Sequence, residues 1–138
     1  MTNDIQITLL TSEEYEQYKD IIPLIDSDWW WLKDAYPRSS YVLHCVNHEG
    51  SGDITGCGGN GGVRPALHIN LTNQKSLNLG DHIRIGSKSF TVLSWENEEL
   101  FALCDECIAI RRFASLNNDW ESSELKQWLE TEGIKLIF

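Results

Sequence analysis

Basic residues are scarce in this chain, which has 11 lysines and arginines against 21 aspartates and glutamates and a formal net charge of -10 at pH 7. A surface of this sign repels a phosphate backbone, so we expect no direct binding of nucleic acid. Long apolar runs are also missing, because no stretch approaches the roughly 20 apolar residues that a membrane-spanning helix needs. The polar start Thr2-Asn3-Asp4 is not typical of a secretory leader. We therefore expect a cytoplasmic protein that does not bind a membrane.

The motifs of several enzyme classes are missing as well. No Gly-Lys-Ser or Gly-Lys-Thr phosphate loop occurs, and Gly50-Ser51-Gly52 lacks the spacing of a nucleophile elbow. The segment Gly56-Cys57-Gly58-Gly59-Asn60-Gly61 matches the Gly-x-Gly-x-x-Gly pattern, but Val63-Arg64-Pro65 follows where a dinucleotide site needs the start of a helix. No nucleophile can be paired with a base. We therefore predict a protein that is not an enzyme, with no catalytic residue and no cofactor-binding loop.

Negative charge is concentrated in two segments of the chain. Residues 1–35 contain eight acidic and two basic residues, and residues 94–132 contain ten acidic and three basic residues. Such charge favours a basic groove on another protein as the partner, although acidity also serves solubility alone. Within the first segment, Asp26-Ser27-Asp28 is a sparse version of a calcium-binding loop.

Hydrophobic spacing and capping residues predict two helices. Thr11 and Glu14 form a capping box, which predicts a helix from Ser12 to about Ile22. Ser122 or Ser123 can cap a second helix near the end of the chain. The apolar stripe of this helix and its expected end are Leu125, Trp128, Leu129 and Gly133.

Apolar runs and alternating patterns predict strands between these helices, and therefore an α+β fold. In chain order the predicted strands span 5–9, 29–32, 41–47, 63–71, 81–85, 89–95, 99–104 and 134–138. Asn60-Gly61 suits a tight hairpin, and Gly86-Ser87 and residues 96–98 are further expected hairpin turns. In the strand at 29–32, Trp29 and Trp31 share one face and Trp30 lies on the other. We expect this triplet to anchor the core, because each buried aromatic side chain removes about 150–250 Å² from water.

Two tryptophan-rich blocks carry a family resemblance. The first contains Trp29-Trp30-Trp31-Leu32 and Gly62-Val63-Arg64-Pro65-Ala66-Leu67, and the second contains Trp120-Glu121-Ser122-Ser123-Glu124-Leu125-Lys126-Gln127-Trp128-Leu129. Together they resemble a domain of unknown function that is common in Gram-positive bacteria and their phages. That domain is related in fold to C-type lectins and to formylglycine-generating enzyme. The resemblance implies a compact domain with C-type-lectin-like mixed sheets, and it implies a structural partner for Arg64 inside the fold.

The two blocks stand in reversed order compared with those relatives, in which the Trp-Leu helix block comes first. This order implies a circularly permuted single domain over residues 1–138. Its halves are residues 1–72 and 79–138, and residues 73–78 form the linker. Such a rearrangement is tolerated because the termini of a domain usually lie close together at its surface. The alternative is that the chain is a slice through a tandem repeat.

The four cysteines form two pairs that suggest a metal site. Cys104 and Cys107 have the two-residue spacing with which one turn of backbone presents two thiolates to zinc, and Cys45 and Cys57 make the second pair. Four thiolates would close a tetrahedral structural zinc site, in which His44 or His48 could replace one ligand. The alternatives are buried free thiols or, for Cys104 and Cys107, a redox pair. Disulfides are not expected in a reducing cytoplasm.

Small size, acidity and resemblance to a phage-associated family together lead to a functional hypothesis. In general type the chain is similar to small acidic anti-CRISPR proteins. This likeness implies a non-catalytic, monomeric protein-binding module that inhibits a host nucleic-acid-guided nuclease in the bacterial cytoplasm, with its acidic surface against a basic groove. The alternative is a lectin-like module of a phage or cell-surface protein, which recognises a glycan or another ligand through the glycine-rich loops.

Overall fold

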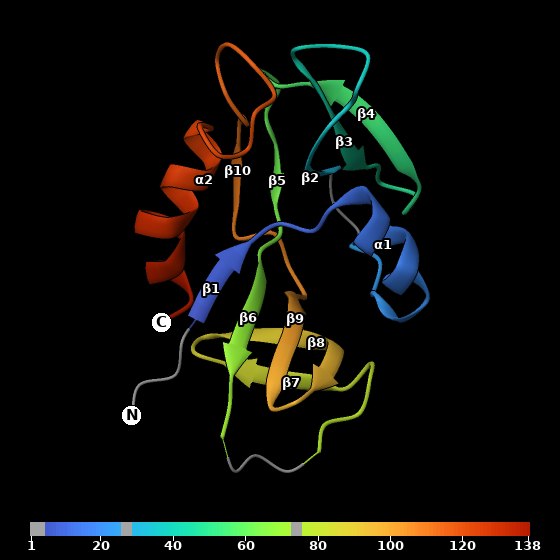
Figure 1. Ribbon diagram of the computed structural model, residues 1–138, viewed down its shortest axis with the longest axis vertical. Helices are drawn as coiled ribbons and strands as arrows, with labels where there is room; N and C mark the ends of the chain where they lie inside the picture. Colours follow the sequence, from blue (N-terminus) through green and yellow to red (C-terminus); the bar gives the residue numbers. More distant parts are fainter. Residues whose placement is uncertain (1–4, 26–28, 73–75) are drawn as a thin grey trace.

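A computed structural model describes residues 5–25, 29–72 and 76–138 of the chain (Figure 1). The predicted α+β class is confirmed, and the α-helices of the described residues are the two that were expected. The elements in chain order are β1 (Ile5–Thr8), α1 (Ser12–Tyr18), the 3-10 helix η1 (Lys19–Ile21), β2 (Trp30–Ala35), β3 (Val42–Val46), β4 (Gly52–Gly56), β5 (Gly61–Val63), β6 (Ala66–Asn70), β7 (His82–Ile85), β8 (Lys88–Glu96), β9 (Glu99–Cys104), β10 (Ala109–Arg111), α2 (Glu124–Trp128), the π-helical turn η2 (Leu129–Gly133) and the 3-10 helix η3 (Ile134–Leu136).

The first sheet has the strand order β1-β6-β9-β8-β7, and every neighbouring pair in it is antiparallel. Its two tight turns lie where the sequence predicts them. Gly86 has a φ of 60°, and Asn97 and Glu98 have φ values of 52° and 63°. Positive φ at both central residues, Asn97 and Glu98, is the geometry of a type I′ turn, and positive φ at the first central residue alone, Gly86, is that of a type II′ turn. The twist of both turn types matches that of the flanking strands. The expected hairpin turns at Gly86-Ser87 and at residues 96–98 are therefore confirmed.

The second sheet has the strand order β10-β5-β2-β3-β4, in which only β2 and β5 are parallel. The chain leaves this sheet after β5 and enters the first sheet as β6 (Figure 1). The prediction of one continuous strand over 63–71 is therefore wrong. Pro65 lies between the two strands, where it has no N–H to donate and its carbonyl oxygen accepts a hydrogen bond from the Cys104 N–H at 2.9 Å.

The predicted hairpin at Asn60-Gly61 is also wrong. Neither residue has a positive φ, and Gly61 opens β5 beside β10 instead of turning the chain back onto β4. The physical reason for glycine here is close packing, because Gly61 and Gly62 are buried beneath the side chains of Trp29 and Cys107.

The tryptophan triplet divides its side chains between two buried clusters, as the alternation of a strand predicts. Trp31 is fully buried in the larger cluster, and the Trp29 ring lies against it at a centroid distance of 4.7 Å. Trp30 belongs to the second cluster, where Tyr15 meets it edge-on at 5.4 Å. Both sequence halves contribute to both clusters, and examples from the larger one are Leu43, Val63, Leu67, Phe90, Val92, Leu125 and Leu129.

The capping box of the first helix is confirmed in full. The Thr11 hydroxyl accepts from the Glu14 N–H at 3.1 Å, and the Glu14 carboxylate accepts from the Thr11 N–H at 2.9 Å. Regular α-helix ends at Tyr18 and a 3-10 turn continues to Ile21, so the predicted span was nearly correct. None of the helices in the described parts of the chain has the length and hydropathy needed to cross a bilayer.

The end of the chain differs from its prediction. Ser123 caps α2 by accepting from the Lys126 N–H at 3.0 Å, and Leu125 and Leu129 are buried as the stripe predicts. The helix does not stop at Gly133, however. It passes through Gly133 with helical angles, and a Cβ there would lie 2.9 Å from Leu129 and 3.0 Å from Trp128. This glycine therefore permits close packing instead of ending the helix.

The predicted closing strand at 134–138 is wrong, because these residues continue the helix as the 3-10 turn η3. The N–H groups of Ile137 and Phe138 donate to the Ile134 carbonyl at 3.2 Å and 3.1 Å. A five-residue apolar run does not distinguish a strand from a buried helical segment by its pattern. Of the predicted linker, residues 76–78 lie in the connection between β6 and β7, while residues 73–75 lie outside the described residues.

Close packing at Gly62 predicts a matched pair of alanine variants. A Cβ at Gly62 would lie 2.6 Å from Cys107 Sγ and 3.1 Å from the Trp29 carbonyl oxygen, whereas a Cβ at Gly58 would meet nothing within 4 Å. We expect Gly62→Ala to lower the free energy of unfolding by about 1–3 kcal/mol through overpacking. Gly58→Ala is expected to change it by less than about 0.5 kcal/mol. Urea titration measures both, and equal stabilities of the two variants would contradict this packing.

Candidate functional site, two grooves that meet at His68

An acidic groove lies between α1 and the hairpin of β8 and β9, with a volume of about 230 Å³. Its acidic side chains come from both acidic segments of the sequence, Glu14 from the first and Glu96 and Glu99 from the second. No lysine or arginine lines it in the described part of the chain. The complete lining is Glu14, Gln17, Tyr18, His68, Ser94, Glu96, Glu99, Leu100 and Phe101.

Glu96 and Glu99 concentrate negative charge at one end of this groove. Both side chains are exposed, and the two residues are direct cross-strand partners in the hairpin. Like charges at directly opposite positions repel one another, so this pair opposes folding unless a cation approaches. Neither carboxylate is paired with a lysine, arginine or histidine among the described residues. The hairpin is therefore suited to a positively charged partner.

Aromatic rings form the floor of the acidic groove. The His68 ring stacks on Phe101 at a centroid distance of 4.2 Å and an interplanar angle of 17°, and Tyr18 meets Phe101 at 6.2 Å. Burial lowers the pKa of His68 below its ordinary value of 6.5, although Glu14 opposes the shift. The ring is therefore neutral at pH 7, and it offers a flat apolar face beside the carboxylates.

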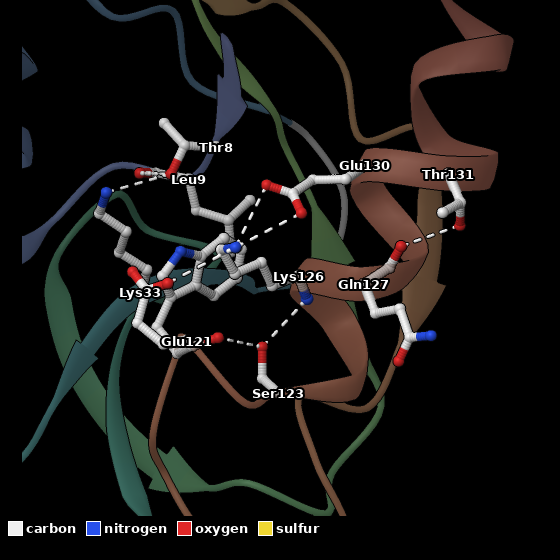
Figure 2. A network of polar contacts seen from close by, with 10 residues as sticks. Thr8, Leu9, Lys33, Glu121, Ser123, Lys126, Gln127, Glu130 and Thr131 are labelled. Carbon is white, nitrogen blue, oxygen red and sulfur yellow. Dashed lines mark hydrogen bonds and ion pairs between the residues drawn. The ribbon is translucent and has the colours of Figure 1, made fainter.

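A second groove, which we call the β1 groove, lies between β1 and the C-terminal helix and has a volume of about 500 Å³. Figure 2 shows its polar network, in which Lys126 extends toward Glu121 and Glu130. The Lys126 Nζ lies 3.5 Å from Glu121 Oε2 and 3.3 Å from Glu130 Oε2. Across the groove, the Lys33 Nζ donates to the Thr8 hydroxyl at 3.1 Å. The lining is Ile5, Gln6, Ile7, Thr8, Lys33, His68, Trp120, Glu121, Lys126, Glu130 and Ile134.

His68 lines both grooves, so this one residue borders each of them. None of these three residues, His68, Lys33 and Lys126, belongs to a site that the sequence predicts. They come from β6, β2 and α2, and nothing in their local sequence indicates that the fold brings them to one surface. Of the features visible in the sequence, only the two acidic segments indicate this surface.

A separate polar cluster surrounds Asp105, just after β9. Its carboxylate accepts from the Ser89 hydroxyl at 2.7 Å and the Thr91 hydroxyl at 2.5 Å, and His82 Nδ1 lies 3.1 Å away. Burial raises the pKa of Asp105, but the hydrogen bonds from Thr91, Ser89 and His82 together outweigh burial and lower it below 3.8. The cluster joins β7 and β8 to the end of β9, which gives it a structural role.

Arg64 has the interior role that the family resemblance implied. It is 1% exposed, and its guanidinium donates to the carbonyl oxygens of Cys104 at 2.6 Å and Pro23 at 3.1 Å. The guanidinium also lies 4.9 Å from the centre of the Trp30 ring. Two carbonyl oxygens and an aromatic face therefore stabilise this buried cation.

Of the four cysteines predicted as zinc ligands, Cys57 and Cys104 both belong to the larger apolar cluster, and Cys107 packs against the second one. Cys45 is buried in β3. Burial raises the pKa of Cys45 to about 12 and also raises the pKa of Cys104, so burial favours the protonated form of both thiols. The described residues contain no group of three histidine, cysteine or acidic side chains arranged to hold a metal ion. This arrangement lends the zinc site no support, and the site stays a prediction.

The other candidate ligands lie beside carboxylates or fall outside the described residues. His44 Nε2 is 3.8 Å from Asp34, and the exposed His48 is 3.7 Å from Glu49. The calcium loop suggested by Asp26-Ser27-Asp28 lies outside the described residues.

Comparison with known proteins finds a match for one part of the chain. Residues 4–71 match a family model described as a domain of unknown function (DUF6273). This match covers the first tryptophan-rich block, from before β1 to the end of β6. Neither a search of curated proteins nor a search of solved structures finds a significant match.

The cluster around Asp105 predicts a specific dependence of stability on pH. Because the pKa of this carboxyl is lower in the folded chain, its stabilisation is present above the ordinary value of 3.8 and is lost as the pH falls through the lower folded value. We expect Asp105→Asn to lower the free energy of unfolding by about 1–3 kcal/mol at pH 7, since it removes hydrogen bonds to a charged acceptor. The difference from the unmodified chain should shrink below pH 4.

Denaturant titrations between pH 3 and pH 7 measure this difference. Glu98→Gln is the matched control, because it removes one negative charge from an exposed turn. A deficit in Asp105→Asn that is the same at every pH would show that the carboxylate does not carry the effect.

The zinc prediction is tested by metal analysis of the chain purified under reducing conditions. A four-thiolate site predicts one zinc per chain and loss of folded structure on chelation, because binding free energy then contributes to folding. Replacing Cys57 with serine should release the metal. A chain that is metal-free and retains its folded near-ultraviolet circular dichroism spectrum would rule the site out.

Proposed function

We propose that this chain is a non-catalytic protein-binding module that uses its acidic groove to engage a basic surface of a partner protein. The observation that carries this proposal is the convergence of Glu14, Glu96 and Glu99 on one groove that no lysine or arginine lines among the described residues. Cross-strand repulsion between Glu96 and Glu99 is relieved when a cationic partner approaches. The stacked rings of His68 and Phe101 supply flat contact area beside the charges.

Charge also favours rapid encounter with such a partner. The net charge of -10 is carried on a chain of 138 residues, and complementary potentials raise association rates more than they raise affinity. Screening by salt acts over about 8 Å at physiological ionic strength, so binding that depends on this field weakens as salt is added. A basic partner is therefore distinguished from an apolar one by salt dependence.

The partner that we propose is the nucleic-acid-binding channel of a host nucleic-acid-guided nuclease, as in anti-CRISPR inhibition. Such a channel holds nucleic acid through lysine and arginine contacts to phosphates. Carboxylates in the acidic groove would compete for the same cations. The acidity and small size of the chain support this proposal, as does its resemblance to a phage-associated family.

We further propose that the fold is a circularly permuted relative of the C-type-lectin-like domains. The order of the two tryptophan-rich blocks supports the permutation. Contact between β1 and η2 also supports it, because these elements lie near opposite ends of the chain (Figure 1). The alternative function is glycan recognition by the glycine-rich loops, in which Gly52, Gly58 and Gly59 are exposed, whereas Gly61 and Gly62 are buried in β5.

The proposed function predicts salt-dependent inhibition. We expect the chain to slow target-DNA cleavage by a purified RNA-guided nuclease, and to do so less as ionic strength rises. A double variant, Glu96→Gln with Glu99→Gln, should inhibit several-fold less well, because two charges leave the acidic groove. Measuring cleavage rates against inhibitor concentration tests this expectation.

The matched control removes the same charge elsewhere. Glu49→Gln with Glu132→Gln alters two exposed carboxylates that do not line the acidic groove, and it should inhibit like the unmodified chain. Equal loss of inhibition in both double variants would show that the net charge of the chain, and not the acidic groove, determines inhibition. Absence of inhibition across a panel of such nucleases would contradict the proposed partner.

A further inference from the structure

We propose that two copies of this chain associate through β4, with the outer edges of the two β4 strands paired antiparallel about a twofold axis at Ile54. The inference rests on the edge position of β4, on the direction of its backbone groups and on its self-complementary sequence. It departs from the monomer that the likeness to anti-CRISPR proteins implies. It does not depend on the proposed function, because α1 and the first sheet form the acidic groove, whereas β4 belongs to the second sheet.

β4 is an edge strand whose one neighbour in the second sheet is β3. Figure 1 shows it at the margin of the structure, with no described helix or strand beyond it. Gly52, Asp53 and Ile54 are all exposed, and consecutive residues of a strand face opposite sides, so neither face is covered there. Lysine, proline or a bulge often protects such an edge from pairing. β4 contains no lysine or proline, and its register with β3 is unbroken.

The hydrogen bonds between β3 and β4 show which backbone groups of β4 point outward. At one end of the ladder the Asn47 N–H donates to the Ser51 carbonyl at 2.9 Å. At the other end the Cys57 N–H donates to the Tyr41 carbonyl at 2.8 Å. Hydrogen-bonded pairs alternate along an antiparallel ladder, so the odd-numbered residues of β4 bond to β3. The N–H and carbonyl groups of its even-numbered residues therefore point away from the sheet.

Contacts within the chain satisfy only part of this outer edge. The Ile54 N–H donates to the Asp53 carboxylate at 2.8 Å, and the Gly56 carbonyl accepts from the Gly59 N–H at 3.3 Å. Within the described parts of the chain, the Ile54 carbonyl and the backbone groups of Gly52 have no partner on this side. Such a row of backbone groups is a template for another strand.

The sequence of β4 is self-complementary about Ile54. When Ile54 of one copy lies opposite Ile54 of the other, Gly52 lies opposite Gly56 and Asp53 lies opposite Thr55. The outward-pointing residues then meet one another at hydrogen-bonded positions, and each Ile54 N–H donates to the Ile54 carbonyl of the other copy. The Asp53 carboxylate, which must release that N–H, accepts from the Thr55 hydroxyl of the other copy instead. This match favours a second copy over an unrelated strand.

The two glycines of β4 also fit the approach of another backbone. Glycine weakens a strand, and it often marks a place where a second backbone comes close. Neither Gly52 nor Gly56 has a positive φ. A Cβ at Gly52 would lie 3.6 Å from Glu16 Oε1, and a Cβ at Gly56 would lie 4.0 Å from the Tyr41 ring, so the packing of the single chain permits a side chain at both positions. Pairing of two copies supplies a reason for glycine that the single chain lacks.

Charge makes this association different from the proposed binding of a basic partner. Each copy carries a net charge of -10, so two copies repel one another. Added salt screens this repulsion. We therefore expect self-association to strengthen as ionic strength rises, whereas nuclease inhibition through the acidic groove weakens. The two proposals can thus fail independently of one another.

Sedimentation velocity from micromolar to millimolar concentrations tests the inference. We expect the average mass to rise from that of a monomer toward that of a dimer, and to rise further with salt. Ile54→Lys should weaken association at least tenfold, because two lysines would then face one another across the axis. The matched control is Ile110→Lys, which makes the same change at an exposed isoleucine of β10, the opposite edge of the second sheet. It should associate like the unmodified chain.

Disulfide cross-linking tests the register. In a hydrogen-bonded antiparallel pair the Cα atoms lie about 5.5 Å apart, which suits a disulfide. With oxidised glutathione as the oxidant, Ile54→Cys should form a covalent dimer. Thr55→Cys should form several-fold less, because residue 55 lies opposite Asp53 of the other copy. The unmodified chain measures any background from its own cysteines, and circular dichroism verifies that each variant folds.

Several results would overturn the inference. One is a chain that stays monomeric over the whole range of concentration and salt, and another is equal association of Ile54→Lys and the unmodified chain. Loss of association in Ile110→Lys instead would assign the contact to β10. Equal cross-linking of Ile54→Cys and Thr55→Cys would contradict the twofold axis at Ile54.

Discussion

Burial of Trp30 and Trp31 on opposite faces of β2 is the constraint on which the rest of the structure depends. Trp31 is inaccessible to solvent in the larger cluster, and its indole N–H donates to the Arg111 carbonyl at 2.8 Å, which ties β2 to β10 across 80 residues of sequence. Trp30 meets Tyr15 of α1 on one side and the guanidinium of Arg64 on another. One strand therefore connects both sheets, the first helix and the buried cation.

The grooves are consequences of this arrangement. The second cluster holds α1 against the first sheet, because Tyr15 and Tyr18 pack there with Trp30 and Phe101. That contact places Glu14 beside the β8–β9 hairpin and creates the acidic groove. The larger cluster holds α2 through Leu125 and Leu129, and the space left between this helix and β1 is the β1 groove. Both grooves thus lie where a helix stops covering the first sheet.

The sequence predicted the features that depend on neighbouring residues. Thr11 with Glu14 and the Ser123 cap signal helix starts because the groups that bond lie three residues apart. The errors arose where distant packing decides the conformation. In the sequence Gly133 resembles a helix end. Glycine is needed there, however, because the side chains of Trp128 and Leu129 leave little room for a Cβ atom. Residues 134–138 resemble a strand, but they continue a helix against the turn at Ser87, whose N–H donates to the Ile137 carbonyl at 2.6 Å.

The candidate site was predictable only in its charge. Two acidic segments were visible, whereas the meeting of Glu14 with Glu96 and Glu99 depends on the packing of α1, and Lys33 and His68 have no local signal. A nuclear magnetic resonance titration of the chain with an octalysine peptide at low salt tests most directly whether the acidic groove binds a cationic partner. We predict saturable chemical-shift changes that centre on Glu14, Glu96, Glu99 and His68. Shifts spread evenly over all exposed carboxylates, or centred away from this groove, would contradict it.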